Sequence, residues 1–167
     1  LFRSGGRMSP DLTREYAAHC DSNGMRFFAM YGQTEASPRM SYVPPEHALS
    51  KAGTIGIPIP GGTMELQSEA GAVLTGATAV GEIVYRGPNV CLGYAESRAA
   101  LALGDVNGGI LHTGDLAERD EDGYYRIVGR QKRFIKLFGN RVNLHEVELQ
   151  LSSSATEVAR RPKSSAT

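Results

Sequence analysis

Met25-Arg26-Phe27-Phe28-Ala29-Met30-Tyr31 is a short apolar run rich in aromatic residues, and it decides the fold class. A run of this length and composition predicts a buried strand. Upstream of it, Ser9-Pro10-Asp11 combines a capping hydroxyl, a proline at the first helical position and an acid near the positive end of a helix dipole. We therefore expect a helix that runs to about Asn23 and ends in a left-handed turn at Gly24.

A further strand is expected ahead of this helix, because Leu1-Phe2-Arg3-Ser4-Gly5-Gly6 is typical of a strand that closes into a glycine turn. The order strand, helix, strand predicts an α/β arrangement. From Ser37 onward, repeated prolines and glycines predict a long loop region.

The remaining elements are expected to make the fold a mixed α+β one. Alternating apolar residues predict two strands of a half-buried antiparallel sheet or barrel, and two further strands are joined by the hairpin signal Asp120-Glu121-Asp122-Gly123. A modest helix is expected at 95–103. The four strands are expected at 63–67, 81–86, 116–119 and 124–128.

Composition excludes several classes of protein. The chain has 167 residues, 18 basic and 18 acidic side chains, and 41% hydrophobic residues, so it can form a core and is not wholly disordered. No apolar run approaches the roughly 20 residues of a membrane helix. Zero net charge argues against a protein built mainly to bind nucleic acid. Cys20 and Cys91 are far apart and fit a reducing compartment, so we expect a cytoplasmic location.

The first candidate site is Tyr31-Gly32-Gln33-Thr34-Glu35, at the carboxyl end of the predicted buried strand. Ligands of open α/β sheets favour that edge. The aromatic ring could stack on a base, the glycine admits a phosphate to the backbone amides, and the carboxylate could hold Mg²⁺. The alternative is a polar loop with Tyr31 packed in the core.

The second candidate site is His112-Thr113-Gly114-Asp115-Leu116. A short carboxylate after a glycine turn can accept both hydroxyls of a ribose. Asp115 as a simple turn or cap residue is the alternative.

The third candidate site is the basic segment that begins at Gly129-Arg130 and continues through Arg141, with five cations in twelve positions. Apolar residues such as Phe134 and Ile135 are interleaved with the cations, so the segment is expected to pack. A packed segment that keeps its cations is a candidate phosphate-facing strand. The alternatives are a solvated surface paired with the acidic hairpin, or nucleic-acid binding.

Taken in order, these segments resemble the adenylate-forming superfamily: acyl-CoA synthetases, fatty acyl-AMP ligases, adenylation domains of peptide synthetases and beetle luciferases. Tyr31 to Glu35 is similar to the Y-G-x-T-E motif, His112 to Asp115 to the T-G-D motif, and Gly129 to Glu148 to the G-R-x-x-x-x-I-K…G-x-x-V…E-v-E block. The resemblance runs from Ser4 to Glu148, and the motifs occur in the family's order and spacing.

The resemblance implies the end of a large adenylation domain, followed by the start of a small C-terminal domain. The first would occupy residues 1–130, with a strand-helix-strand part and an antiparallel, barrel-like subdomain. The second would occupy 131–151, and 152–167 would be a disordered tail.

The resemblance also implies roles for the first cluster. Gly5 and Gly6 would lie against the adenine through their backbone, and Tyr31 would stack on its other side. Thr34 would bond the α-phosphate and Glu35 would ligate Mg²⁺.

For the later clusters, the resemblance implies that Asp115 grips the ribose hydroxyls and that Arg130 reaches the same ribose or a phosphate. Lys132 would be the hinge of the small domain. Lys136 would lie on the strand that swings to the active site for the second half-reaction, and Gly139 on the turn that shapes the thiol channel.

The implied reaction joins a small-molecule carboxylic acid to ATP, giving acyl-AMP and pyrophosphate. A thiol, either of coenzyme A or of a pantetheine arm on an acyl carrier protein, would then take the acyl group. The family's Ser/Thr/Gly-rich phosphate loop and its adenylation lysine are absent from the sequence. We therefore expect an internal or truncated portion that is inactive alone. The alternatives are a non-enzymatic nucleotide-binding module and a basic-surface RNA binder.

Overall fold

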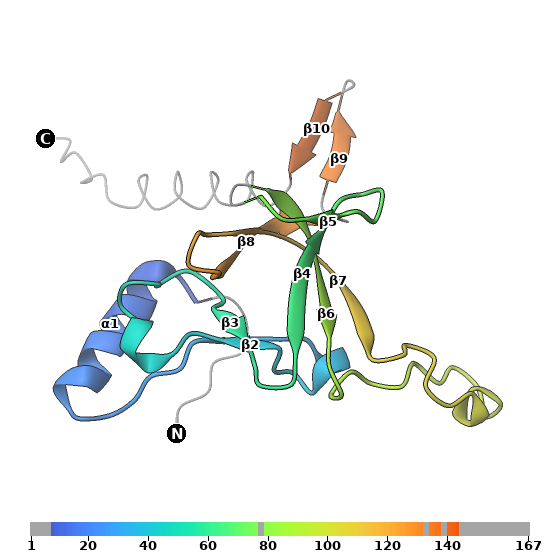
Figure 1. Ribbon diagram of the computed structural model, residues 1–167, viewed down its shortest axis with the longest axis horizontal. Coiled ribbons are helices and arrows are strands. Elements are labelled where there is room, and N and C mark those ends of the chain that lie inside the picture. Colours follow the sequence, from blue (N-terminus) through green and yellow to red (C-terminus); the bar gives the residue numbers. More distant parts are fainter. Residues whose placement is uncertain (1–7, 77–78, 132–133, 138–139, 144–167) are drawn as a thin grey trace, which may run out of the picture. The chain divides into compact units, whose positions relative to one another are not determined.

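The computed structural model describes residues 8–76, 79–131, 134–137 and 140–143 (Figure 1). It divides into two compact units, Leu1–Val128 and Gly129–Thr167, and each is described by itself. The strand expected at Leu1-Phe2 lies outside the described residues, as do four site residues and the tail expected at 152–167. These four residues are Gly5, Gly6, Lys132 and Gly139.

The single α-helix of the described residues, α1 (Pro10–Ser22), begins and ends where the sequence predicts. The Ser9 Oγ accepts a hydrogen bond from the Leu12 N–H at 3.3 Å, which satisfies one of the amides left without a partner at a helix start. Gly24 has a φ of 65°, as expected for a residue that ends a helix in the left-handed conformation. No helix in the described part of the chain is long and apolar enough to cross a membrane.

The buried strand expected over 25–31 is wrong in extent. The strand β1 contains only Met30–Tyr31, and the side chains of Met25 and Met30 are half exposed. Among the described strands, β1 pairs only with the two-residue β2 (Ser41–Tyr42), so its ladder ends where that partner ends. The third strand of this antiparallel sheet is β3 (Ile57–Pro58).

The largest sheet among the described residues has five strands, with the order β5-β4-β6-β7-β8. All four strands predicted after the loop region are found in it, and the pairings of β4 with β5 and β6, and of β6 with β7, are antiparallel. The mixed α/β class is therefore confirmed. The bounds are β4 Thr63–Gln67, β5 Val73–Leu74, β6 Val80–Arg86, β7 Ile110–Arg119 and β8 Tyr125–Arg130.

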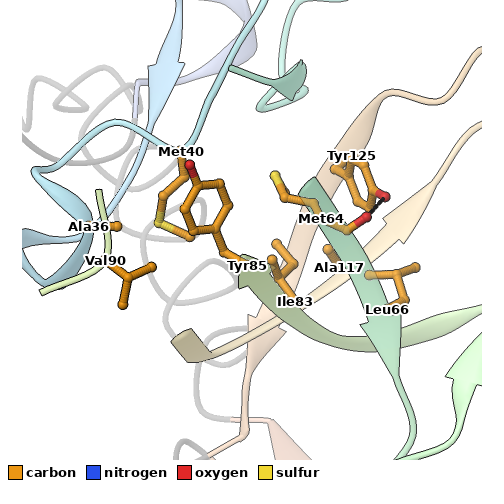
Figure 2. Close-up of a cluster of buried hydrophobic side chains, with 9 residues drawn as sticks. All are labelled: Ala36, Met40, Met64, Leu66, Ile83, Tyr85, Val90, Ala117 and Tyr125. Carbon is orange, nitrogen blue, oxygen red and sulfur yellow. Dashed lines mark hydrogen bonds between the residues drawn. The ribbon is translucent and has the colours of Figure 1, made fainter. Parts of the chain in front are cut away.

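One face of this sheet carries the hydrophobic core (Figure 2). Ile83 and Tyr85, alternate residues of β6, share this face and are fully buried, and Val84 between them is fully buried on the opposite face. The Tyr125 hydroxyl donates to the Met64 carbonyl at 2.7 Å, which satisfies its polar atom inside the core. The buried cluster consists of Ala36, Met40, Met64, Leu66, Ile83, Tyr85, Val90, Ala117 and Tyr125.

The hairpin signal at 120–123 is confirmed. The Asp120 N–H donates to the Tyr124 carbonyl at 2.9 Å, and Gly123 has a φ of 85°. In contrast, the helix expected at 95–103 is wrong, because only a 3₁₀ turn, η3 (Ala100–Ala102), forms there. Leu101 and Leu103 are exposed, so this segment lacks the buried apolar face that stabilises a short helix.

The second unit contains a two-stranded antiparallel sheet of β9 (Phe134–Leu137) and β10 (Asn140–Asn143). Lys136 lies in β9 opposite Arg141 in β10. Two further 3₁₀ turns, η1 (Thr34–Ala36) and η2 (Pro45–His47), belong to the first unit. The expected domain boundary after residue 130 stays a prediction.

Candidate functional site

The first two candidate sites, far apart in the sequence, meet at Asp115. The Tyr31 hydroxyl donates to Asp115 Oδ2 at 2.6 Å, although the two residues are 84 positions apart. The Gln33 Nε2 donates to the same oxygen at 3.0 Å and to the Thr113 carbonyl at 2.9 Å. Asp115 is only 4% exposed. The fold therefore builds a buried carboxylate with two side-chain donors from the loop after β1.

Tyr31 is held between this polar cluster and the core. Its ring is partly buried and packs against the hydrophobic cluster. Burial raises the pKa of the Tyr31 hydroxyl well above its usual range, and the hydrogen bond to Asp115 raises it further. Tyr31 is therefore a neutral donor. Stacking of its ring on a base stays a prediction.

Asp115 lies inside a strand, and this corrects the expectation that it follows a glycine turn. In the pairing of β6 with β7, Glu82 is opposite Leu116 and Val84 is opposite His112. Three residues of β7, numbers 113–115, therefore stand against Ile83 alone. An excess of residues on one strand is a β-bulge, a feature that re-aims side chains next to functional sites.

The bulge depends on local chemistry at Thr113 and Gly114. Gly114 has a φ of 68°, a conformation that glycine adopts without steric cost. The Thr113 hydroxyl donates to the Ile83 carbonyl at 2.8 Å and accepts the Asp115 N–H at 3.1 Å. The Thr-Gly-Asp order therefore has a structural meaning, because the first two residues form the bulge that presents the third.

Thr34 and Glu35 lie on η1, directly after Gln33. Thr34 is exposed, and the fully buried Ala36 anchors the turn in the core. The Glu35 carboxylate accepts a hydrogen bond from the Tyr94 hydroxyl. This bond lowers the pKa of the Glu35 carboxyl, and a bond with its own backbone adds to the effect.

Sequence reasoning missed a segment that holds η1 in place. The Asn89 Nδ2 donates to the carbonyls of Ala36 at 2.7 Å and Arg39 at 2.9 Å, and its Oδ1 accepts from the Tyr85 hydroxyl at 2.7 Å. The Cys91 N–H donates to the Glu35 carbonyl at 2.7 Å. Gly87-Pro88-Asn89 is a turn sequence, but its partners are about 50 residues away and could not be read from it.

The structure does not bring every predicted site residue together. Arg130 is exposed at the end of β8 and Lys136 lies in β9, both in the second unit. Their approach to a nucleotide stays a prediction. Gly32, in contrast, lies in the first unit between Tyr31 and Gln33, where the loop backbone turns back on itself.

Binding of Mg²⁺ by the Glu35 carboxylate stays a prediction. No group of three or more His, Cys, Asp or Glu side chains that could hold a metal ion exists among the residues described. Mg²⁺ usually keeps several waters and binds through one or two carboxylates plus substrate phosphates. One carboxylate beside an exposed threonine hydroxyl fits that requirement.

Comparison with known proteins first gives the class. The chain is 33% identical over 141 residues to a 2-succinylbenzoate–CoA ligase of Geobacillus sp. (strain WCH70), covering 84% of this chain and 28% of the relative. It is 40% identical over 123 residues to a probable 4-coumarate–CoA ligase of Dictyostelium discoideum, covering 74% of this chain and 22% of the relative. Both relatives are acid–CoA ligases by name.

Solved structures agree with this class. The unliganded O-succinylbenzoate coenzyme A synthetase of Bacillus subtilis matches with a TM-score of 0.68 at 30% identity, over 89% of this chain and 31% of that one. The same enzyme in complex with ATP and magnesium ion matches with a TM-score of 0.67 at 29% identity, over 90% of this chain and 30% of that one.

A sequence model of the AMP-binding enzyme family matches residues 1–95, more than half of the 167 residues. The chain belongs to the AMP-binding enzyme family. It spans about a quarter of the length of the curated relatives described above. The resemblance to the adenylate-forming superfamily is thereby confirmed.

Proposed function

We propose that this chain carries part of the nucleotide site of an AMP-forming acid–thiol ligase of the acyl-CoA synthetase type. A carboxylate would attack the α-phosphate of ATP to give acyl-AMP and release pyrophosphate, and a thiol would then take the acyl group and release AMP. The observation that carries the proposal is the buried Asp115 carboxylate, bonded by Tyr31 and Gln33 from a distant loop. The names of the related CoA ligases support it.

Asp115 is the residue that would bind the ribose. A carboxylate has four lone-pair sites and can accept two ribose hydroxyls. Tyr31 and Gln33 both donate to Oδ2, so they orient the carboxylate before a ligand arrives. In this proposal Tyr31 also offers its ring to the adenine.

Thr34 and Glu35 would face the phosphates. The Thr34 hydroxyl would donate to the α-phosphate, and the Glu35 carboxylate would hold Mg²⁺. When bound, Mg²⁺ would neutralise part of the charge that develops on the phosphate oxygens. The Tyr94 hydroxyl, as donor to Glu35, holds that carboxylate in one orientation.

The second unit would contribute the basic side chains that act on the nucleotide and in the thiol-transfer step. Arg130 would reach the ribose or a phosphate, Lys132 would act as the hinge, and Lys136 would serve the thiol-transfer step. The relatives' names favour coenzyme A as the thiol. An acyl carrier protein is the alternative acceptor, and a cytoplasmic location stays a prediction.

Nucleotide binding by the purified 167-residue chain tests the proposal. We expect AMP, titrated by calorimetry, to bind, and Asp115→Asn to weaken binding about tenfold, because hydrogen bonds to a charged group contribute about 1.5–3 kcal/mol. The control is Asp11→Asn, which removes an exposed carboxylate from α1. Unchanged AMP binding by Asp115→Asn would contradict the ribose assignment.

A second measurement separates the proposal from its alternatives. Joined to the regions of a related CoA ligase that this chain does not span, the chain should support carboxylate-dependent pyrophosphate release. A nucleotide-binding module would bind AMP and never release pyrophosphate. An RNA binder would bind RNA with a steep salt dependence and would be poorly displaced by ATP.

A further inference from the structure

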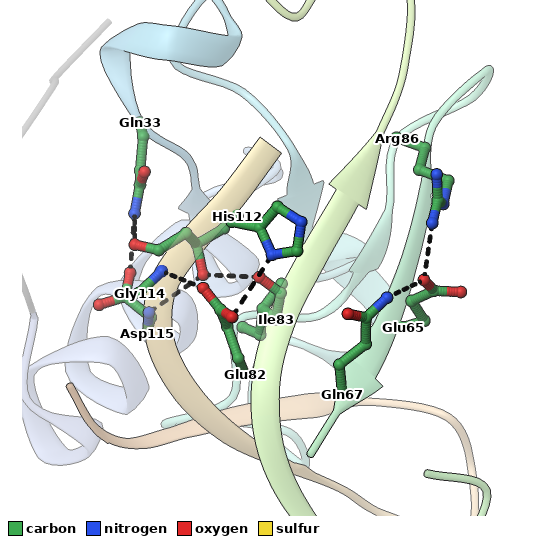
Figure 3. Close-up of polar contacts among 10 residues, drawn as sticks. Gln33, Glu65, Gln67, Glu82, Ile83, Arg86, His112, Gly114 and Asp115 are labelled. Atoms are coloured by element: carbon green, nitrogen blue, oxygen red, sulfur yellow. Dashed lines mark hydrogen bonds and ion pairs between the residues drawn. The ribbon is translucent and has the colours of Figure 1, made fainter. Parts of the chain in front are cut away.

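Glu82 is the third residue of β6 and lies next to the bulge that presents Asp115 (Figure 3). Its side chain is only 13% exposed. Its Oε1 accepts the Gly114 N–H at 2.9 Å, and its Oε2 lies 3.4 Å from Nδ1 of His112. A largely buried carboxylate therefore bonds the residue that immediately precedes Asp115.

The Glu82 bond replaces a ladder bond that the bulge removes. A β-bulge leaves the amide of its extra residue without a partner on the neighbouring strand. Even a partly buried amide in that state costs free energy unless a side chain accepts its hydrogen. Glu82 accepts the Gly114 N–H and the Thr113 hydroxyl accepts the Asp115 N–H, so consecutive amides of the bulge are both held by side-chain oxygens.

Glu82 acts from the face of the sheet opposite to the core. Ile83, the next residue of β6, belongs to the buried cluster, and neighbouring side chains of a strand point to opposite faces. Asp115, in contrast, accepts the hydroxyl of Tyr31, which packs against that cluster. A nucleotide bound to Asp115 would therefore lie on the face of Asp115 and Tyr31. Glu82, on the opposite face of the sheet, would not contact it.

We infer that Glu82 is a positioning residue for nucleotide binding. By holding the Gly114 amide it sets the backbone of the bulge and aims the Asp115 carboxylate at the ribose hydroxyls. The inference rests on the proposed function, since it takes Asp115 to be the ribose-binding residue.

The test compares two probes, AMP and 2′,3′-dideoxy-AMP, which lacks both ribose hydroxyls. Each is titrated against the full chain and against Glu82→Ala, Glu82→Asp and Glu82→Gln. Alanine and aspartate withdraw the acceptor from the Gly114 amide, whereas glutamine keeps an oxygen at the same distance along the side chain. The matched control is Glu65→Ala, because Glu65 is a partly exposed carboxylate on β4 whose hydrogen-bond donors are Gln67 and Arg86 (Figure 3).

We expect Glu82→Ala and Glu82→Asp to weaken AMP binding about tenfold and to leave dideoxy-AMP binding unchanged. Glu82→Gln and Glu65→Ala should both bind AMP as the unaltered chain does. If Glu82→Ala does not fold, the test relies on Glu82→Asp. In that variant the NMR chemical shifts of the Gly114 and Asp115 amides should differ from those of the unaltered chain.

Three results would overturn the inference. In the first, both short variants bind AMP normally, and in the second they lose AMP and dideoxy-AMP equally, which indicates general loss of structure. In the third, the unaltered chain does not prefer AMP to dideoxy-AMP, and the ribose role of Asp115 in the proposed function fails as well. The first two results leave the proposed function intact.

Discussion

At the scale of single residues, Gly32 decides the shape of the loop that carries Thr34 and Glu35. A Cβ atom on Gly32 would lie 2.0 Å from the carbonyl oxygen of Pro38, far inside the contact distance of two atoms. Ser37 has a φ of 55°, a left-handed conformation that turns the chain back at this point. The glycine is required for space, since the loop folds onto its own backbone there.

Gly32→Ala is therefore expected to destabilise the fold. The clash is with backbone, which cannot move aside as a flexible side chain can, so the loss in the free energy of unfolding should be about 3 kcal/mol. The control is Gly71→Ala, where the added Cβ meets nothing within 4 Å but φ is 79°. That variant should lose only about 1 kcal/mol, the cost of a left-handed residue. Urea unfolding measures both, and equal losses would contradict the steric argument.

At the scale of elements, those whose signals are local were predictable. The helix α1 follows from its cap, its proline and its terminal glycine, and β4 and β6 follow from alternation of apolar residues. The extent of β1 was not predictable, because it is set by the two residues of β2 that pair with it. The helix expected at 95–103 failed for the same reason, since burial of a face depends on distant contacts.

The site residues also fall into those that a local motif predicts and those that depend on distant contacts. Tyr31 and Asp115 could be found from their motifs, and the structure brings them into contact. Three other residues, Asn89, Tyr94 and Glu82, act through partners about 30 to 60 residues away in the sequence. No local sequence pattern predicts such contacts. The sequence around Gly114 predicts a turn, because glycine is common in turns and in bulges, and only the pairing with β6 distinguishes the two.

One cation, Lys51 in the loop between η2 and β3, binds the hairpin that joins β7 and β8. The Lys51 Nζ donates to Asp120 Oδ2 at 2.7 Å and to Asp122 Oδ2 at 2.6 Å, and it lies 4.7 Å from the centre of the Tyr124 ring. Burial raises the pKa of the Asp120 carboxyl, but the hydrogen bonds from Lys51 and from the Tyr124 N–H outweigh it. The net pKa of Asp120 is lowered, and the two aspartates raise the pKa of Lys51.

Lys51→Met should therefore lower stability in a pH-dependent way. The pKa of folded Asp120 is depressed, so its contribution is present above the unfolded pKa of about 4 and is lost as the pH falls through the folded value. The contribution of Lys51, whose folded pKa is raised, is present below about pH 10.4 and is lost above it. Thermal midpoints should differ most between about pH 5 and 9 and converge in acid. A constant difference down to pH 2 would contradict an ionic origin.

At the scale of the whole molecule, the candidate site and the core belong to the same unit. Tyr31, Asp115 and Glu82 all lie within Leu1–Val128, as does the buried cluster. The cations proposed for the later step, such as Lys136, lie in Gly129–Thr167. A division of this kind predicts that stability, and ribose recognition by Asp115, do not depend on β9 and β10.

A chain that ends at Gln131 tests this division, because it keeps β8 complete and removes β9 and β10. The core is untouched, so it should unfold in one cooperative transition with a midpoint within about 3 °C of that of the 167-residue chain. Its affinity for AMP should also be unchanged. A chain that ends at Asn107 is the matched comparison, since it lacks β7 and with it Asp115, and both its cooperative transition and its AMP binding should be lost. If the Gln131 chain also lost cooperativity, β9 and β10 would be part of the folding core, and this prediction would be wrong.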